Sequence, residues 1–215
     1  MRFRTKETVA ARRREANAYH EAGHAVVAHM LGYEVLRVTI VPKAGSEGHV
    51  SWRHPINRRV SSKLEFGSEA DIDKVRYRID HAIIVSKAAA LAQKRHNPRS
   101  GWRYAGSGAA PGEFLLKGSD DQQALEWASR VHEDDEKVRE AYMRYLEARA
   151  EALVKHHWCR IERLAKKLLK CETVSGTDAI KEAISPLMKR QASCRALRST
   201  GARANVDPSG APGLK

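Results

Sequence analysis

The 215-residue sequence has few cysteines, few aromatic residues and no long apolar run. No segment approaches the roughly 18 apolar residues of a membrane-spanning helix, and the basic N-terminus is followed by no apolar run of signal-peptide length. The cysteines are widely spaced and form no C-x-x-C pair, so they indicate neither a disulfide framework nor a cysteine zinc site. They are Cys159, Cys171 and Cys194. We therefore expect a cytoplasmic protein with no membrane partner.

Positive charge is concentrated at the two ends of the chain. The net charge is +13, and residues 1–14 and 187–215 together carry ten of these charges. A nucleic-acid-binding protein would place basic residues on folded elements, with aromatic residues interleaved, and neither pattern is present. We therefore predict a basic N-terminal extension at 1–14, one domain at 15–188 and a disordered basic tail at 189–215. Weak contact of the ends with nucleic acid or acidic partners is the alternative.

Residues 20–24 read His-Glu-Ala-Gly-His, an H-E-x-x-H pentad in an amphipathic helical pattern. Good helix formers precede it and Gly32 is a typical C-cap, which predicts a helix from about residue 8 to residue 31. On a helix, His20 and His24 are about 400° apart, one turn plus about 40°, so both imidazoles can bind one metal ion. Glu21 lies at the edge of that face and can remove a proton from a water without binding the metal. This pattern is typical of zinc peptidases.

Gly23 lies inside the same predicted helix. Glycine costs a helix about 1 kcal/mol relative to alanine, and this penalty usually signals close packing of another backbone. We expect that backbone to be a strand lying over the helix.

A zinc hydrolase needs a third protein ligand, which the spacing does not identify. His29 is about 180° around the helix from His20 and faces away from the metal. The extended metzincin signature is absent, because Val27 and Met30 stand at its glycine and histidine positions. The ligand should therefore come from a later segment. The carboxylates available there are Glu65, Glu69, Asp71, Asp73, Asp120 and Asp121.

The remaining pattern predicts a mainly helical (α+β) fold with a small β-hairpin. Two short strands are expected at 34–41 and 49–52. A long helix is expected at 68–94, further helical periodicity at 119–170, and a last helix that is capped at Ser175 and ends near residue 188. Aromatic side chains of the later helices are expected to pack in the core or between helices rather than to form a ligand site. They are Trp127, Tyr142, Tyr145 and Trp158.

The predicted hairpin follows the zinc-site helix and has two possible roles. A strand pair can present an edge to an extended peptide, and the alternative is a structural hairpin that covers the helix. If the hairpin binds substrate, the contacts are expected from Val38, Thr39, Ile40, His49 and Val50.

Three blocks of the sequence resemble the peptidase domain of FtsH-type ATP-dependent zinc metalloproteases. Residues 19–27, followed by 38–42 and 48–52, resemble that family's zinc helix and hairpin. The Gly-Ser-Asp sequence at 118–120, with alanines at 124 and 128, is similar to the helix start that supplies an aspartate ligand. Residues 161–169 and 172–176 are similar to the family's closing helices.

The resemblance implies a zincin-like endopeptidase domain that binds Zn²⁺ and cleaves polypeptides. By this resemblance His20, His24 and Asp120 are the zinc ligands and Glu21 is the general base. Asp121 is the alternative third ligand, and is otherwise an acid that favours the first turn of a helix.

The sequence also departs from the family. It contains no Gly-Lys pair and therefore no phosphate loop, so we expect a stand-alone domain that relies on unfolded substrates or on a separate ATPase. Residues 86–92 replace the family's acidic Gly-Arg helix segment, and membrane tethering is not carried over. A homo-oligomer is left open. Two other functions remain: a catalytically silent zinc-binding or peptide-binding module, and a nucleic-acid-associated protein in which the pentad is a coincidence.

Overall fold

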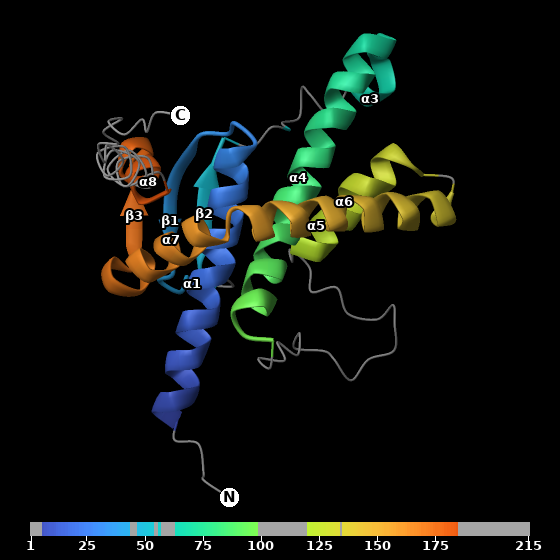
Figure 1. Ribbon diagram of the computed structural model, residues 1–215. Helices are drawn as coiled ribbons and strands as arrows, with labels where there is room; N and C mark the ends of the chain where they lie inside the picture. Colours follow the sequence, from blue (N-terminus) through green and yellow to red (C-terminus); the bar gives the residue numbers. More distant parts are fainter. Residues whose placement is uncertain are drawn as a thin grey trace, which may run out of the picture. The chain divides into compact units, whose positions relative to one another are not determined.

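The computed structural model describes residues 6–43, 47–53, 56, 63–98, 120–133 and 135–184 (Figure 1). They belong to one compact unit, Met1–Ile184, and the predicted tail at 189–215 lies outside the described residues. The elements in chain order are α1 (Lys6–Met30), β1 (Val35–Thr39), β2 (His49–Trp52), α3 (Lys63–Phe66), α4 (Glu69–His96), α5 (Asp120–Val131), α6 (Glu136–His156), α7 (Trp158–Cys171), β3 (Thr173–Ser175) and α8 (Thr177–Ile184). The predicted mainly helical fold with a small β-component is confirmed.

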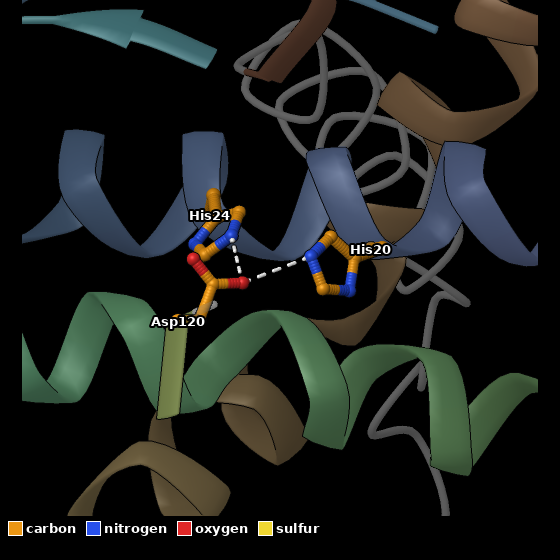
Figure 2. Close-up of side chains that lie close together, drawn as sticks. All are labelled: His20, His24 and Asp120. Atoms are coloured by element: carbon orange, nitrogen blue, oxygen red, sulfur yellow. Dashed lines mark hydrogen bonds and ion pairs between the residues drawn. The ribbon is translucent and has the colours of Figure 1, made fainter. Parts of the chain in front are cut away.

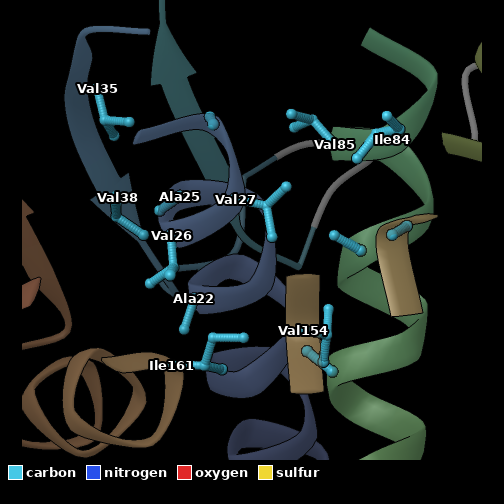
Figure 3. Close-up of a cluster of buried hydrophobic side chains, with 14 of the residues drawn as sticks. Ala22, Ala25, Val26, Val27, Val35, Val38, Ile84, Val85, Val154 and Ile161 are labelled. Carbon is cyan, nitrogen blue, oxygen red and sulfur yellow. The ribbon is translucent and has the colours of Figure 1, made fainter. Parts of the chain in front are cut away.

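Helix α1 forms the centre of the described core. It packs against α4, α7 and both strands of the hairpin, and Ala22 and Val26 are fully buried between these elements (Figure 3). The helix begins at Lys6, so most of the stretch expected to be an extension is helical. Arg14 in this stretch donates hydrogen bonds to the Leu169 carbonyl oxygen (3.2 Å) and to the Glu172 carboxylate (2.8 Å).

The sheet has three antiparallel strands in the order β2-β1-β3. The predicted hairpin of β1 and β2 is confirmed, whereas β3 was not predicted, because three residues directly after a helix are too few to show strand alternation. Val38 in β1 pairs with Val50 on one side and with Val174 on the other. The hydroxyls of Thr39 and Thr173 share a hydrogen bond of 2.7 Å. Both sides of β1 are therefore occupied.

The helical region predicted to run through 119–170 consists of three helices. The break before α6 comes from Asp135, whose side chain accepts a hydrogen bond (3.0 Å) from the backbone N–H of Val138 and caps the helix. His157 forms the turn before α7. Helix α8 is described to Ile184, and the predicted end near residue 188 lies outside the described residues. No helix in the described ranges is long and apolar enough to cross a membrane.

The aromatic side chains of these helices do not all pack inside. Trp127, Tyr142 and Trp158 are partly buried against the core. Tyr145 is 58% exposed, with the Arg149 guanidinium over its ring, so the prediction of core packing is wrong at this position.

Gly23 lies where α1 and α4 come into backbone contact. A Cβ atom added to Gly23 would lie 2.8 Å from the Ala92 Cβ, 2.9 Å from the Ala88 carbonyl oxygen and 3.0 Å from the Ala89 Cα. The predicted close packing is present, but the partner is a helix and not a strand. The small side chains of α4 at these positions allow the two helices to approach this closely.

We expect Gly23→Ala to destabilise the protein, although alanine is the better helix former. Helix propensity favours the variant by about 1 kcal/mol, but the added methyl group meets backbone atoms of α4, and overpacking of this kind costs about 1–3 kcal/mol. The measurement is urea unfolding of both proteins in EDTA, which separates packing from metal binding. A variant that is more stable than the wild type by the propensity increment would contradict the close approach.

Candidate metal centre

Two histidines of α1 and the first residue of α5 converge on one point (Figure 2). The Nε2 atom of His20 lies 3.1 Å from Asp120 Oδ2, and the Nε2 atom of His24 lies 3.0 Å from the same oxygen. Within the described ranges, no other group of histidine, cysteine and acidic side chains is arranged to share a metal ion. The structure thus brings together the three residues predicted as ligands, and their role as ligands remains a prediction.

The other candidate carboxylates lie elsewhere. Asp121 points to α4, where its Oδ1 lies 2.6 Å from Lys87 Nζ. Asp71, in the first turn of α4, pairs with Lys63. Asp73 is an exposed residue of the same helix, and the side chain of Glu65 lies outside the described residues.

The donor set suits zinc. Nitrogen and oxygen ligands at their usual bond lengths in a tetrahedral zinc site are about 3.3 Å from one another. The two observed N···O separations, 3.0 and 3.1 Å, are close to that value. Two imidazoles and one carboxylate leave one of four positions for solvent, which is the composition of a catalytic zinc site and not of a structural one.

Helix α4 orients His24. The Nδ1 atom of His24 donates a hydrogen bond (2.9 Å) to the Val85 carbonyl oxygen. When the His24 ring is neutral, its proton is therefore on Nδ1, and the lone pair of Nε2 is on the side of Asp120. Backbone support of this kind is typical of metal-binding histidines.

The electrostatics of the metal-free cluster favour a charged pair. Burial alone would lower the pKa of His24, but the Asp120 carboxylate outweighs it and raises that pKa to about 9. Burial acts against ionisation of Asp120, yet His24 and His20 hold the pKa of its carboxyl well below the usual range. A metal ion that binds here must displace a proton from His24, so metal affinity depends on pH.

Glu21 is buried beside this cluster, with 5% of its surface exposed. Burial raises the pKa of its carboxyl above the ordinary value, and the nearby His24 and His20 partly oppose the shift. The space for the carboxyl comes from Gly48, because a Cβ atom there would lie 2.6 Å from Glu21 Oε1. Gly48, directly before β2, is therefore part of the site.

The segment before β2 is tied to α1. The side-chain amide of Asn17 donates a hydrogen bond to the Glu47 carbonyl oxygen, and Arg13 forms an ion pair with the Glu47 carboxylate. These contacts hold Gly48 over Glu21. Sequence reasoning missed them because they join segments about 30 residues apart, although Gly48 itself stands in a block that resembles the FtsH-type hairpin.

The sheet order shows which of the residues predicted to bind substrate have an open strand edge, and the substrate-binding role of all five stays a prediction. Val38, Thr39 and Ile40 belong to the central strand or continue it, and Val38 and Ile40 are 0% and 4% exposed. The Ile40 N–H also donates to the Glu172 carbonyl oxygen at 2.9 Å. These three residues offer no open strand edge, because β1 has a neighbour on each side. His49 and Val50 lie on β2, which is an outer strand of the described sheet, and for them the prediction stands untested.

Residues 7–73 match the family model for peptidase family M41. The matched stretch includes the H-E-x-x-H pentad and the hairpin and stops before Asp120. The match supports an FtsH-type peptidase domain over this part of the chain, and metallopeptidase activity in general terms. No curated protein matches the chain.

We expect Asp120→Asn to weaken zinc binding by more than about 100-fold. Loss of a residue that only supports a metal ligand costs about 10- to 100-fold in affinity, and loss of a ligand itself should cost more. The amide carries no negative charge, so it cannot replace the carboxylate that faces both histidines. The measurement is competition for Zn²⁺ with a chromophoric chelator at fixed pH. Asp73→Asn removes an exposed carboxylate of α4 and should bind zinc as the wild type does. Equal affinity in the two variants would show that Asp120 is not a ligand.

Proposed function

We propose that the protein is a zinc-dependent endopeptidase that hydrolyses flexible or unfolded polypeptides. The observation that carries this proposal is the convergence of His20, His24 and Asp120 next to the buried carboxyl group of Glu21. The match of residues 7–73 to peptidase family M41 supports it independently.

In this proposal Zn²⁺ is held by His20, His24 and Asp120. Bound zinc acidifies water and polarises a peptide carbonyl. Glu21 accepts one proton from the attacking water and delivers it to the nitrogen of the leaving amine. Burial raises the pKa of the Glu21 carboxyl group above its ordinary value, which makes the carboxylate a stronger base for the first of these steps.

We further propose that an extended substrate pairs with β2 in a zincin-like arrangement. This strand begins at His49, directly after the glycine that contacts Glu21, and its second neighbour position in the described sheet is unfilled. Main-chain hydrogen bonds to a strand edge hold a peptide of almost any sequence, with side chains such as His49 and Val50 adding preference. Only polypeptide that is already extended can bind in this way, so folded substrates would require a separate ATPase that unfolds them.

The competing proposal is a catalytically silent module that binds zinc or peptides. It has no role for the carboxyl group of Glu21, whose burial costs free energy that a catalytic role would explain. A structural zinc site would also close its fourth position with a protein ligand. The two proposals differ in the effect of one conservative substitution.

We expect Glu21→Gln to retain zinc and to lose cleavage of unfolded casein by about 10²–10⁴-fold, because the amide cannot accept the proton. The measurements are elemental analysis of purified protein and release of labelled casein peptides. Chelation should abolish cleavage by the wild type, and added Zn²⁺ should restore it. Zinc without cleavage in both proteins would favour the silent module, and wild-type protein without zinc would exclude both the zinc endopeptidase and a zinc-binding module.

We expect Gly48→Ala to impair cleavage while leaving zinc content unchanged. The new methyl group would occupy the space of the Glu21 carboxyl, and displacement of a catalytic group by about 1 Å can cost about 100-fold in rate. The measurement is kcat/KM on a labelled peptide. Val41→Ala, at an exposed position between the hairpin strands, is the control and should retain activity. An active Gly48→Ala enzyme would mean that Glu21 tolerates the shift.

A further inference from the structure

Helix α4 contacts the candidate metal centre at two points that are two residues apart. The Val85 carbonyl oxygen accepts the hydrogen bond of His24, and Lys87 pairs with Asp121 beside the third predicted ligand. In Figure 2, α4 runs alongside α1 and the start of α5 lies against it. One helix thus supports groups from both elements that form the centre.

The ion pair between Lys87 and Asp121 is closer and less exposed than a typical surface pair. Its N···O distance is 2.6 Å, and the two side chains are 17% and 26% exposed. The pair of Lys63 in α3 with Asp71 in the first turn of α4 has a distance of 3.0 Å and exposures of 45% and 34%. Reduced contact with water weakens screening, so the inner pair restrains its partners more strongly.

Two adjacent aspartates begin α5, and either carboxylate could bind a metal ion. Successive residues of a helix point about 100° apart, so only one of them can face the histidines at a time. The fully buried residues of α5 are Ala124 and Ala128, and Trp127 and Val131 are partly buried against the core further along the helix. The ion pair of Asp121 with Lys87 adds a directional contact in the first turn, next to Asp120.

We propose that Lys87 is a positioning residue that selects Asp120 as the metal-facing aspartate by holding Asp121 against α4. It touches neither substrate nor metal and acts through Asp121 and the first turn of α5. This inference rests on the proposed zinc site. When a neutral side chain replaces Lys87, Asp121 is no longer held against α4, and the orientation of Asp120 toward the histidines is less well fixed.

The test compares Lys87→Met with Lys63→Met. Methionine keeps the unbranched stem and removes the charge, and Lys63→Met breaks the ion pair that lies outside the centre. We expect Lys87→Met to weaken Zn²⁺ binding by about 10-fold and to change the visible absorption spectrum of bound Co²⁺, whose intensity reports on ligand geometry. Lys63→Met should match the wild type in both measurements.

A second pair of variants separates positioning from a general loss of stability. Asp121→Asn breaks the same ion pair from the other side and should weaken zinc binding in the same direction. The double variant Lys87→Met with Asp121→Asn should be no worse than either single variant, since all three lack the same contact. Melting temperatures in EDTA should differ little among these proteins.

The outcomes distinguish the inference from the function on which it rests. Wild-type affinity and an unchanged Co²⁺ spectrum in Lys87→Met and Asp121→Asn would overturn the positioning role and leave the zinc site standing. Additive losses in the double variant would also overturn it, because the two residues would then act separately. Failure of the wild type to bind either metal would instead overturn the proposed function.

Discussion

The close approach of α1 and α4 at Gly23 is the constraint on which the rest of the centre depends. Because position 23 has no side chain, the backbone of α4 lies against the middle of the pentad. This distance brings the Val85 carbonyl oxygen within hydrogen-bonding reach of His24 and places Lys87 beside the start of α5. A larger side chain at position 23 would separate the two helices and loosen both contacts together. The glycine between Glu21 and His24 is therefore a packing requirement of the candidate metal centre.

The charged side chains of this cluster compensate one another. Asp120 is negative, and in the absence of metal His24 is held in its protonated form by that carboxylate. Glu21 has fewer compensating contacts, and burial keeps its proton affinity high. The carboxyl groups thus differ because of their surroundings: one is stabilised as an anion, and the other is suited to gaining and losing a proton.

Elements with a clear period or a local signal were predictable from the sequence. The pentad helix and the long helix α4 have apolar spacing over many residues, and the hairpin was predicted from two short strands around a turn-rich segment. Strand β3 was not predictable, since its existence depends on pairing with β1 across more than 130 residues. The break before α6 contains neither glycine nor proline, and its signal is only the capping aspartate. The ion pair of Lys87 with Asp121 depends on tertiary placement, so no local pattern reveals it.

Among the site residues, the shared direction of the two histidines follows from helical spacing. Asp120 was predicted only from the family resemblance, because one hundred residues separate it from His20.

That separation has a consequence for the folding of the chain. His20 and Asp120 come from helices that are far apart in sequence, so an ion bound by both closes a loop of about one hundred residues. Like a disulfide, such a link restricts the unfolded chain, with the difference that it opens when the metal is removed or its ligands are protonated. The same ion would therefore act as a reversible cross-link between α1 and α5, and metal supply would influence how long the folded chain survives as well as whether it is active.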